Sequence, residues 1–171
     1  MRIKKLAGLF TVGAAAVAAG VALATPSVGL QSQLLARGAV LDSGDRDDLA
    51  SSLWASDGAS DAAVVRATLE AGGATGWHRH QEGSMVILRS GTLTVKTALE
   101  HVGGGRNGTG QPGCVVETYD ASTGGKAFFH TAGPHTFLNT GTTQAEFYVA
   151  YFAPRGAPLL IDEPVAPSSC N

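Results

Sequence analysis

Three histidines have the residue type and spacing of a metal site. His78 and His80 stand one residue apart in the segment WHRH, and His135 opens the segment HTFLNTG much later in the chain. Side chains two residues apart in a strand point to the same face, so the first pair aims two imidazoles into one space. Neutral imidazole is the commonest protein ligand of divalent transition metals. The pattern is typical of a metal held in the mouth of a β-barrel, and the alternative is imidazoles that are exposed or satisfied within the core.

Short apolar segments, broken by glycines, surround these histidines. Residues 92–96 alternate between polar and apolar types, which is the period of a half-buried strand. The sequence has no helical pattern longer than two turns and no internal repeat. About eight short strands at near-regular spacing predict an all-β sandwich or barrel. Strand-like segments cover residues 29–41, 64–69, 77–80, 84–90, 92–100, 114–120, 126–133, 135–141 and 144–154.

The first 24 residues have the pattern of an export signal. A basic start with Arg2, Lys4 and Lys5 precedes an alanine-rich apolar run, and Ala22-Leu23-Ala24 has the small-x-small pattern of a cleavage site. We expect a secreted, extracellular protein that is cleaved after Ala24. The alternative is an uncleaved membrane anchor, because a run of about 18 apolar residues is near the lower limit for a span.

The remaining 147 residues are enough for one domain with a sizeable core. Cleavage removes three positive charges and no acid, so the formal charge changes from −2 to −5. No basic cluster is left, which argues against nucleic acid as a partner, and no membrane-binding face is evident. We expect an N-terminal strand and acidic loop over residues 25–61, a barrel core over 62–153 and an extended, proline-rich tail over 154–171.

Two long segments are predicted to lie outside the strands. Residues 42–61 are polar and acidic, and are predicted to form a surface loop with a short helical turn near residues 49–54. Residues 101–113 are rich in glycine and are predicted to form a long flexible loop.

Both cysteines, Cys114 and Cys170, follow the predicted signal. In an exported protein a pair of cysteines suggests one disulfide. Such a bond would join the C-terminal tail to the middle of the chain and contribute about 4 kcal/mol on the chain-entropy model. Two free thiols, or a cysteine that binds a metal, are the alternatives.

The histidine pair lies within a motif that resembles the first motif of the cupin superfamily, a group of small jelly-roll barrels. That motif runs from a glycine through His-x-His and a glutamate to a second glycine. Gly72, His78, His80 and Gly91 fall at the corresponding positions, whereas Ser84 stands in place of the glutamate.

The third histidine lies within a segment that resembles the second cupin motif. Gly124, His135 and Asn139 match it, whereas His130 replaces its proline and Ala132 its second glycine. The two motifs occur in the family's order, and the resemblance extends over about residues 62–153. The subgroup that this chain resembles is the small exported proteins with a single type-2 cupin domain.

The resemblance implies a double-stranded β-helix, the cupin jelly-roll barrel, in which His78, His80 and His135 bind one divalent transition metal. Without the motif glutamate a three-histidine site remains, with positions open for water, substrate or dioxygen. Thiol and diketone dioxygenases of this superfamily are similar in using three histidines around iron. Three imidazoles also suit zinc, copper and nickel, and manganese is a further candidate, so the identity of the metal stays open.

Five other residues are candidates for the surroundings of the site. Glu82 could replace the missing carboxylate, and Ser84 could either hold a water or substrate or simply widen the pocket. His130 could be a fourth ligand or a proton shuttle, although its position before His135 favours a loop residue. Trp77 and Phe137 adjoin the predicted ligands, so of the aromatic residues they are the best candidates to line the mouth of the barrel.

Three functions are consistent with this pattern. The first is a metal-dependent oxidoreductase, similar to the dioxygenases, that acts on a small organic molecule. The second is non-catalytic binding of a sugar or metabolite in the same cavity, and the third is a structural domain whose histidines hold zinc or nothing. No acid–base pair is evident, which favours the second and third over a highly evolved catalyst. A small molecule is the expected partner, and a homodimer, which is common among cupins, stays open.

Overall fold

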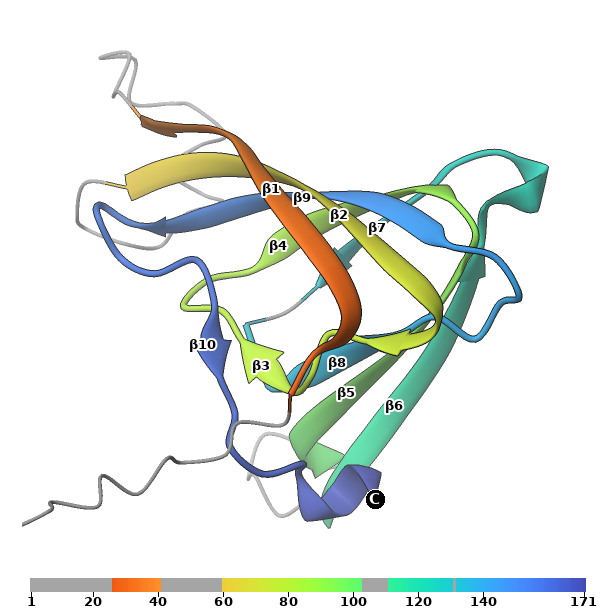
Figure 1. Cartoon of the computed structure of the whole chain (residues 1–171). Helices are drawn as coiled ribbons and strands as arrows, with labels where there is room; N and C mark the ends of the chain where they lie inside the picture. Colours follow the sequence, from red (N-terminus) through yellow and green to blue (C-terminus); the bar gives the residue numbers. More distant parts are fainter. Residues whose placement is uncertain (1–25, 41–59, 103–110, 131) are drawn as a thin grey trace, which may run out of the picture.

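The structure is a computed structural model that describes residues 26–40, 60–102, 111–130 and 132–171. The described residues form ten strands and two short 3₁₀ turns, and none of their helical segments is long and apolar enough to cross a membrane (Figure 1). The predicted signal sequence and most of the acidic loop, with its helical turn, lie outside the described residues. The strands are β1 Val28–Ala39, β2 Ser60–Ala74, β3 His78–Arg79, β4 Ser84–Ser90, β5 Thr92–Val102, β6 Gln111–Asp120, β7 Lys126–His130, β8 His135–Leu138, β9 Ala145–Pro154 and β10 Ile161–Asp162.

The strands form two antiparallel layers that face each other. One layer has the order β1-β2-β9-β4-β7, and the other has the order β10-β3-β8-β5-β6. The layers join where Ala74, at the end of β2, pairs with Leu138 of β8. Figure 1 shows β9, β4 and β7 above and β8, β5 and β6 below, closing a barrel between them. The predicted all-β jelly-roll barrel is confirmed.

The core of the barrel follows from strand alternation. In β9 every second side chain is buried, from Ala145 through Phe147 and Val149 to Ala153. Side chains at i and i+2 share one face of a strand, so this strand directs Ala145, Phe147 and Val149 to the inside of the barrel. The fully buried leucines each contribute about 1.5–3 kcal/mol through burial. They lie on β2, β4 and β5, at Leu69, Leu88 and Leu93.

Strand β2 is longer than the sequence predicts. The sequence predicts a strand over residues 64–69, but β2 begins at Ser60 and continues through the Gly72-Gly73 pair to Ala74. Gly72 has a φ of +75°, and a Cβ on Gly73 would lie 2.7 Å from the carbonyl oxygen of Val28. The two glycines therefore bend the strand without ending it. This bend moves β2 from its partner β9 to β8, the strand that begins with His135.

The predicted loop over residues 101–113 is also shorter than expected. Its ends extend β5 to Val102 and begin β6 at Gln111, and the intervening residues 103–110 lie outside the described residues. Strands β5 and β6 pair over most of their length. They form the long arm of the lower layer, against which the C-terminus packs (Figure 1).

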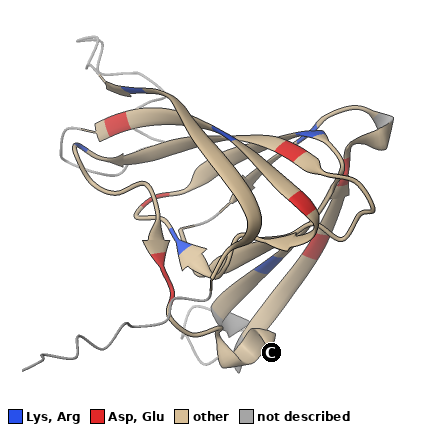
Figure 2. Cartoon of the chain, in the orientation of Figure 1, with Lys and Arg blue, Asp and Glu red and all other residues tan. Residues whose placement is uncertain are grey.

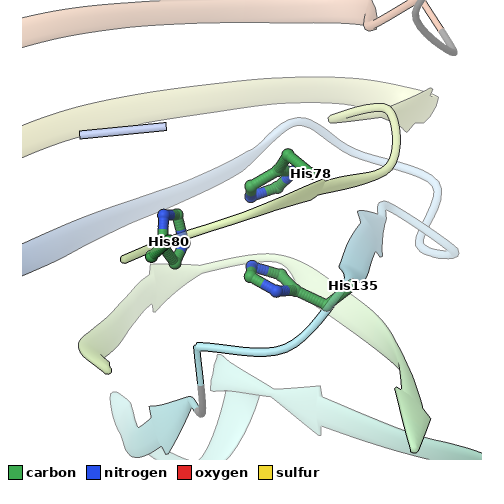
Figure 3. Close-up of side chains that lie close together, drawn as sticks. All are labelled: His78, His80 and His135. Carbon is green, nitrogen blue, oxygen red and sulfur yellow. The ribbon is translucent and has the colours of Figure 1, made fainter. Parts of the chain in front are cut away.

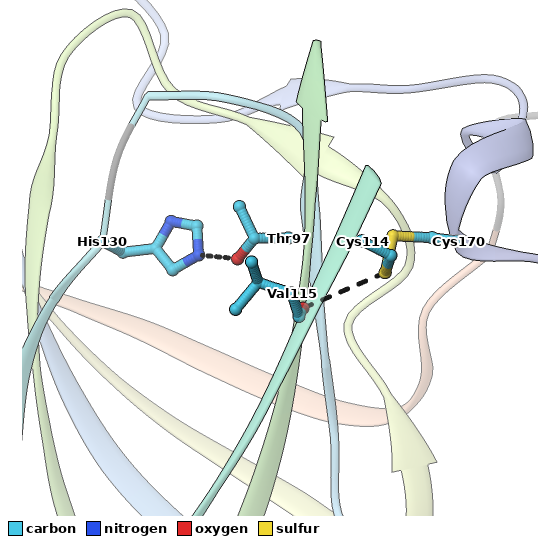
Figure 4. Close-up of a disulfide and its surroundings, with 5 residues drawn as sticks. All are labelled: Thr97, Cys114, Val115, His130 and Cys170. Carbon is cyan, nitrogen blue, oxygen red and sulfur yellow. Dashed lines mark hydrogen bonds between the residues drawn. A yellow bond between two sulfur atoms is a disulfide. The ribbon is translucent and has the colours of Figure 1, made fainter. Parts of the chain in front are cut away.

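The tail is part of the barrel. Its strand β10 pairs with β3, matching Ile161 to Arg79 and Asp162 to His78. A short 3₁₀ turn over Ser168–Cys170 ends it beside β5 and β6. The predicted disulfide between Cys114 and Cys170 is confirmed there (Figure 4).

Charged side chains are spread over the strands of the described chain. Figure 2 shows Lys and Arg on both layers, interspersed with Asp and Glu. Glu146 pairs with Arg66 and Arg89 on the outer face, and Arg37 pairs with the buried Asp61 where β1 meets β2. The two Glu146 pairs join neighbouring strands at the surface, where each contributes little to stability.

Candidate metal centre

The fold brings the three predicted histidines into one cluster inside the barrel (Figure 3). His78 lies directly opposite His135 because β3 pairs with β8 at that position, and His80 follows β3 immediately. The ring centroid of His78 lies 4.3 Å from the ring centroid of His135 and 5.1 Å from that of His80. The ring centroids of His80 and His135 are 4.8 Å apart. All three side chains are buried.

Each histidine is held in the same tautomer by the backbone. The Nδ1 atoms lie 3.0 Å from the carbonyl oxygen of Gly76 for His78, 2.8 Å from that of Leu159 for His80, and 2.7 Å from that of Gly133 for His135. A carbonyl oxygen only accepts hydrogen bonds, so each Nδ1 must carry the proton and donate it. Each Nε2 therefore keeps a free lone pair, and an outer hydrogen bond of this kind orients a metal-binding imidazole.

Burial also keeps the imidazoles neutral. Desolvation lowers the pKa of His80 to about 4 and lowers the pKa of His78, although hydrogen bonds to backbone carbonyls oppose both shifts. Desolvation likewise lowers the pKa of His135, and repulsion from the neighbouring imidazoles lowers it further. A neutral imidazole is the form that binds a metal.

The Nε2 atom of His135 is the clearest sign that the cluster could hold a metal. It is buried and has no hydrogen-bond partner. An unpaired buried polar atom costs about 1–3 kcal/mol, so its position needs a compensating interaction. The ligand atoms of the three histidines all lie within 4.8 Å of one another. Metal–nitrogen bonds of about 2.1 Å place two ligands of one ion about 3–4 Å apart, so small ring movements complete a site and the residues fit a divalent metal.

The motif position that lacks its glutamate is also buried and unpartnered. Ser84 begins β4 opposite His130 of β7 and Tyr151 of β9. Its side-chain oxygen is buried and has no hydrogen-bond partner. The interior of the barrel therefore offers a hydroxyl where the family motif has a carboxylate.

His130 is a strand residue, so the loop interpretation favoured by the sequence is wrong. It ends β7, is buried, and lies with its ring centroid 3.7 Å from that of His135. Its Nε2 atom is 3.0 Å from the hydroxyl oxygen of Thr97, as Figure 4 shows. The segment KAFFH pairs with β4, and this pairing turns the side chain inward. His130 thus adjoins the histidine cluster with one ring nitrogen engaged by Thr97.

The remaining candidates, Glu82, Phe137 and Trp77, differ in their positions relative to the histidine cluster and its cavity. Glu82 lies in the turn between β3 and β4 with one buried, unpartnered carboxylate oxygen, and among the described residues the metal-binding group consists of the three histidines without it. Phe137 lines a cavity beside the cluster, as predicted. Trp77 is buried, but it is not among the residues that line this cavity.

Tertiary contacts add one participant that sequence reasoning missed, the C-terminal tail. Leu159 supplies the carbonyl that orients His80, and β10 covers the outer edge of β3. The amide of Glu163 donates to the carbonyl of Trp77 at 2.9 Å, and its side chain pairs with Arg79. The apolar triplet Leu159-Leu160-Ile161 was the available signal, since a proline-rich tail with no role in the barrel would not need it.

Both motifs now have a structural account. Gly91, with a φ of +82°, turns β4 into β5 so close to β9 that a Cβ would lie 2.7 Å from the Cα of Ala145. Asn139 directly follows β8, donates to the carbonyls of Leu69 and Thr143, and accepts from the amide of Gly141. The fold is the all-β jelly-roll barrel that the resemblance to cupins implies. The predicted resemblance is confirmed in the barrel and in the positions of both motifs.

No family model and no curated protein matches the sequence of this chain. Its fold is similar to that of an oxalate oxidase, with 20% identity over 58% of this chain and 45% of the other and a TM-score of 0.43. The oxalate decarboxylase of Lactobacillus farciminis shows 20% identity over 57% and 25% of the chains, with a TM-score of 0.42. The polyketide cyclase RemF of Streptomyces resistomycificus shows 15% identity over 85% and 79%, with a TM-score of 0.47. The chain spans less than half the length of the two oxalate enzymes, and similarities at this level carry no inference about its chemistry.

Proposed function

We propose that this cupin binds one divalent transition metal through His78, His80 and His135 and acts on a small organic molecule as a metal-dependent oxidoreductase of the dioxygenase type. The observation that carries the proposal is the convergence of three imidazoles whose Nδ1 atoms are all bound to carbonyls. The buried Nε2 of His135 has no other partner. Such a set is pre-organised for a metal and for little else.

A bound redox-active ion would supply Lewis acidity and electron transfer to dioxygen at the positions that three histidines leave open. The protein's own residues orient the reactants. The carbonyl of Leu159 fixes the ring of His80, while Phe137 and its apolar neighbours line the cavity beside the cluster. Ser84 offers an unpaired hydroxyl inside the same end of the barrel. Burial raises the pKa of Tyr151 to about 12, so its phenol stays protonated beside His80 and can donate a hydrogen bond.

Binding without turnover is the second candidate function. Ser84 occupies the motif glutamate position, and the metal-binding group of the described residues contains no carboxylate. A site without this carboxylate lacks the general base that a glutamate at the motif position could provide. The same three histidines would then hold a metal that only anchors a ligand.

Export is part of the proposal. Disulfides persist in oxidising compartments and are rare in the cytosol. The bond between Cys114 and Cys170 therefore supports secretion and agrees with the signal pattern over residues 1–24.

Metal content tests the proposal directly. The protein is exported by a native-like host, purified without chelators and analysed by elemental mass spectrometry beside His78→Ala, His135→Ala and the control His101→Ala. We expect about one equivalent of metal per chain in the wild type and the control, and loss in the other two variants. Free metal at a hundredfold excess over Kd should also stabilise the wild type by about 2.7 kcal/mol.

The identity of the metal separates the candidate functions. Iron, copper or manganese, followed by oxygen uptake with an organic substrate, would support the oxidoreductase. A bound metal with ligand-dependent stabilisation and no turnover would favour the binding protein. A wild type that holds no metal and gains no stability from any of the five candidate ions would refute the metal site.

A further inference from the structure

A cavity of about 210 Å³ lies beside the histidine cluster, and its lining suggests what the site binds. His78 and His80 form its polar end. Its remaining walls come from β1, β2, β8, β9 and the C-terminal tail. Most of the lining side chains are aliphatic or aromatic, including Val65, Ala67, Phe137, Phe147, Val149 and Leu159.

No charged side chain is among the residues that line this cavity. One of its two aliphatic hydroxyls is already engaged, because Thr75 donates to the carbonyl of Gly76 and accepts from the amide of Phe137, both at 3.0 Å. The other, that of Ser32, lies on the exposed strand β1. The polar groups that remain inside are at the histidine end, where the ring of Tyr151 lies 4.9 Å from that of His80.

This distribution of polarity limits the ligand to one polar end. Next to a metal held by the histidines, the attraction of the metal compensates an anionic or strongly polar ligand oxygen for its loss of hydration. A second carboxylate in the apolar part would be buried without a cation or enough donors, which costs several kcal/mol. A sugar would leave several hydroxyls unpaired there, at about 1–3 kcal/mol each.

The volume limits the ligand to one ring. An apolar protein cavity of about 150 Å³ takes up benzene, so 210 Å³ admits a ring with a small substituent. The aromatic side chains of Phe137 and Phe147 stand in an edge-to-face arrangement, 5.8 Å between centroids, and offer the kind of surface against which a ring packs.

We propose that this site takes a single substituted ring, aromatic or alicyclic, with one oxygen donor directed at the histidine cluster, in preference to dicarboxylates and sugars. The inference rests on the proposed function, because the oxygen donor is expected to meet the metal. The ring itself is recognised by the apolar cavity, which exists independently of the metal.

Calorimetry on the full-length protein loaded with Co²⁺ tests this specificity, with phenol, cyclohexanone, oxalate and glucose as probes. Phenol and cyclohexanone should bind at least tenfold more tightly than oxalate and glucose. Phenol should also change the visible absorption of the Co²⁺, as an oxygen donor beside the ion would. Tighter binding of oxalate or glucose, or binding of none of the four probes to the Co²⁺ protein, would overturn the inference.

Substitutions of residues that line the cavity test whether phenol binds there. Ala67→Leu fills the cavity from β2, whereas Ala62→Leu makes the same change on the outward face of that strand. Ala67→Leu should weaken phenol binding at least tenfold without loss of Co²⁺, and the control should leave both unchanged. Leu160→Trp, at the partly exposed rim, should act like Ala67→Leu and covers the case in which the buried variant does not fold. Phenol affinity that is unchanged in both lining variants would refute the site.

The two proposals fail in different ways. A protein that binds no Co²⁺ yet takes up phenol, with Ala67→Leu abolishing the uptake, would refute the metal site and support the ring specificity of the cavity. A protein that binds Co²⁺ through the three histidines but prefers oxalate would support the metal site and refute the ring specificity.

Discussion

The disulfide between Cys114 and Cys170 should stabilise the fold and tighten metal binding at the same time. It holds the end of the tail against β5 and β6. The preceding part of the tail orients His80 through the carbonyl of Leu159. The perturbation is the double variant Cys114→Ala/Cys170→Ala, which leaves no unpaired thiol to bind metal or to join two chains.

The expected loss of folding stability follows from the length of the loop that the disulfide closes. A sequence separation of 56 residues corresponds to about 4 kcal/mol of chain entropy at 25 °C. That is a large part of the 5–15 kcal/mol typical of a whole domain. Without the disulfide, β10 is kept by its pairing with β3, by the bond from Glu163 to Trp77 and by the bond to His80, and such bonds contribute about 1 kcal/mol each. When the tail separates, His80 loses its outer hydrogen bond, which should lower metal affinity about 10–100-fold.

Urea denaturation and metal titration of the double variant measure the two effects. Leu88→Ala is the matched control, because this buried residue of β4 lies in the core and outside the tail, and its loss costs about 2–5 kcal/mol. Stability should fall in both variants, whereas metal affinity should fall only in the cysteine variant. A cysteine variant that loses less than about 1 kcal/mol and binds metal as tightly as the wild type would refute the coupling of the tail to the site.

Three further predictions concern individual residues. Asn139→Ala should cost about 3 kcal/mol in urea denaturation, because it leaves the carbonyls of Leu69 and Thr143 without their donor, and a loss below about 0.5 kcal/mol would contradict that role. Ser84→Glu restores the motif carboxylate and should raise metal affinity at least tenfold while lowering the stability of the metal-free protein. Titration of the wild type and of Ser84→Glu with Mn²⁺ checks the change in affinity. The amide of Gly156 and the guanidinium of Arg37 lower the pKa of Asp61, so its ionised form stabilises the fold above the ordinary pKa of about 3.9 and this contribution is lost as the pH falls through the lowered value. The wild type should therefore be more stable than Asp61→Asn at pH 7, with the difference shrinking below about pH 4, and a difference that grows on acidification in thermal melts would contradict this.

Parts of the site depended only on local pattern, and the sequence determined them. The His-x-His spacing puts two imidazoles on one side of a strand whatever surrounds it. The period-2 alternation and the glycines between the segments similarly predicted an all-β fold. His135 was found because the second motif stands in order after the first, and the cysteine pair indicated a disulfide through the chemistry of exported proteins.

Long-range contacts decided the rest. His130 became a buried strand residue because its segment pairs with β4, and β2 passed its glycine pair because those glycines bend the strand toward β8. Leu34 of β1 is exposed although it is apolar, since β1 lies at the edge of its layer. Each of these outcomes depends on which strands lie beside the segment in the folded chain.

The C-terminal tail shows most clearly what the sequence determined and what the tertiary structure determined. From the sequence it was an extended proline-rich segment, because prolines fix local conformation and do not specify a partner strand. In the folded chain its position is set by β3, by the disulfide and by the imidazole of His80. The sequence determined which atoms can bind a metal, and the tertiary structure determined which nitrogen of each ring is free to do so, because tautomer and orientation depend on carbonyls such as that of Leu159, 79 residues away from His80.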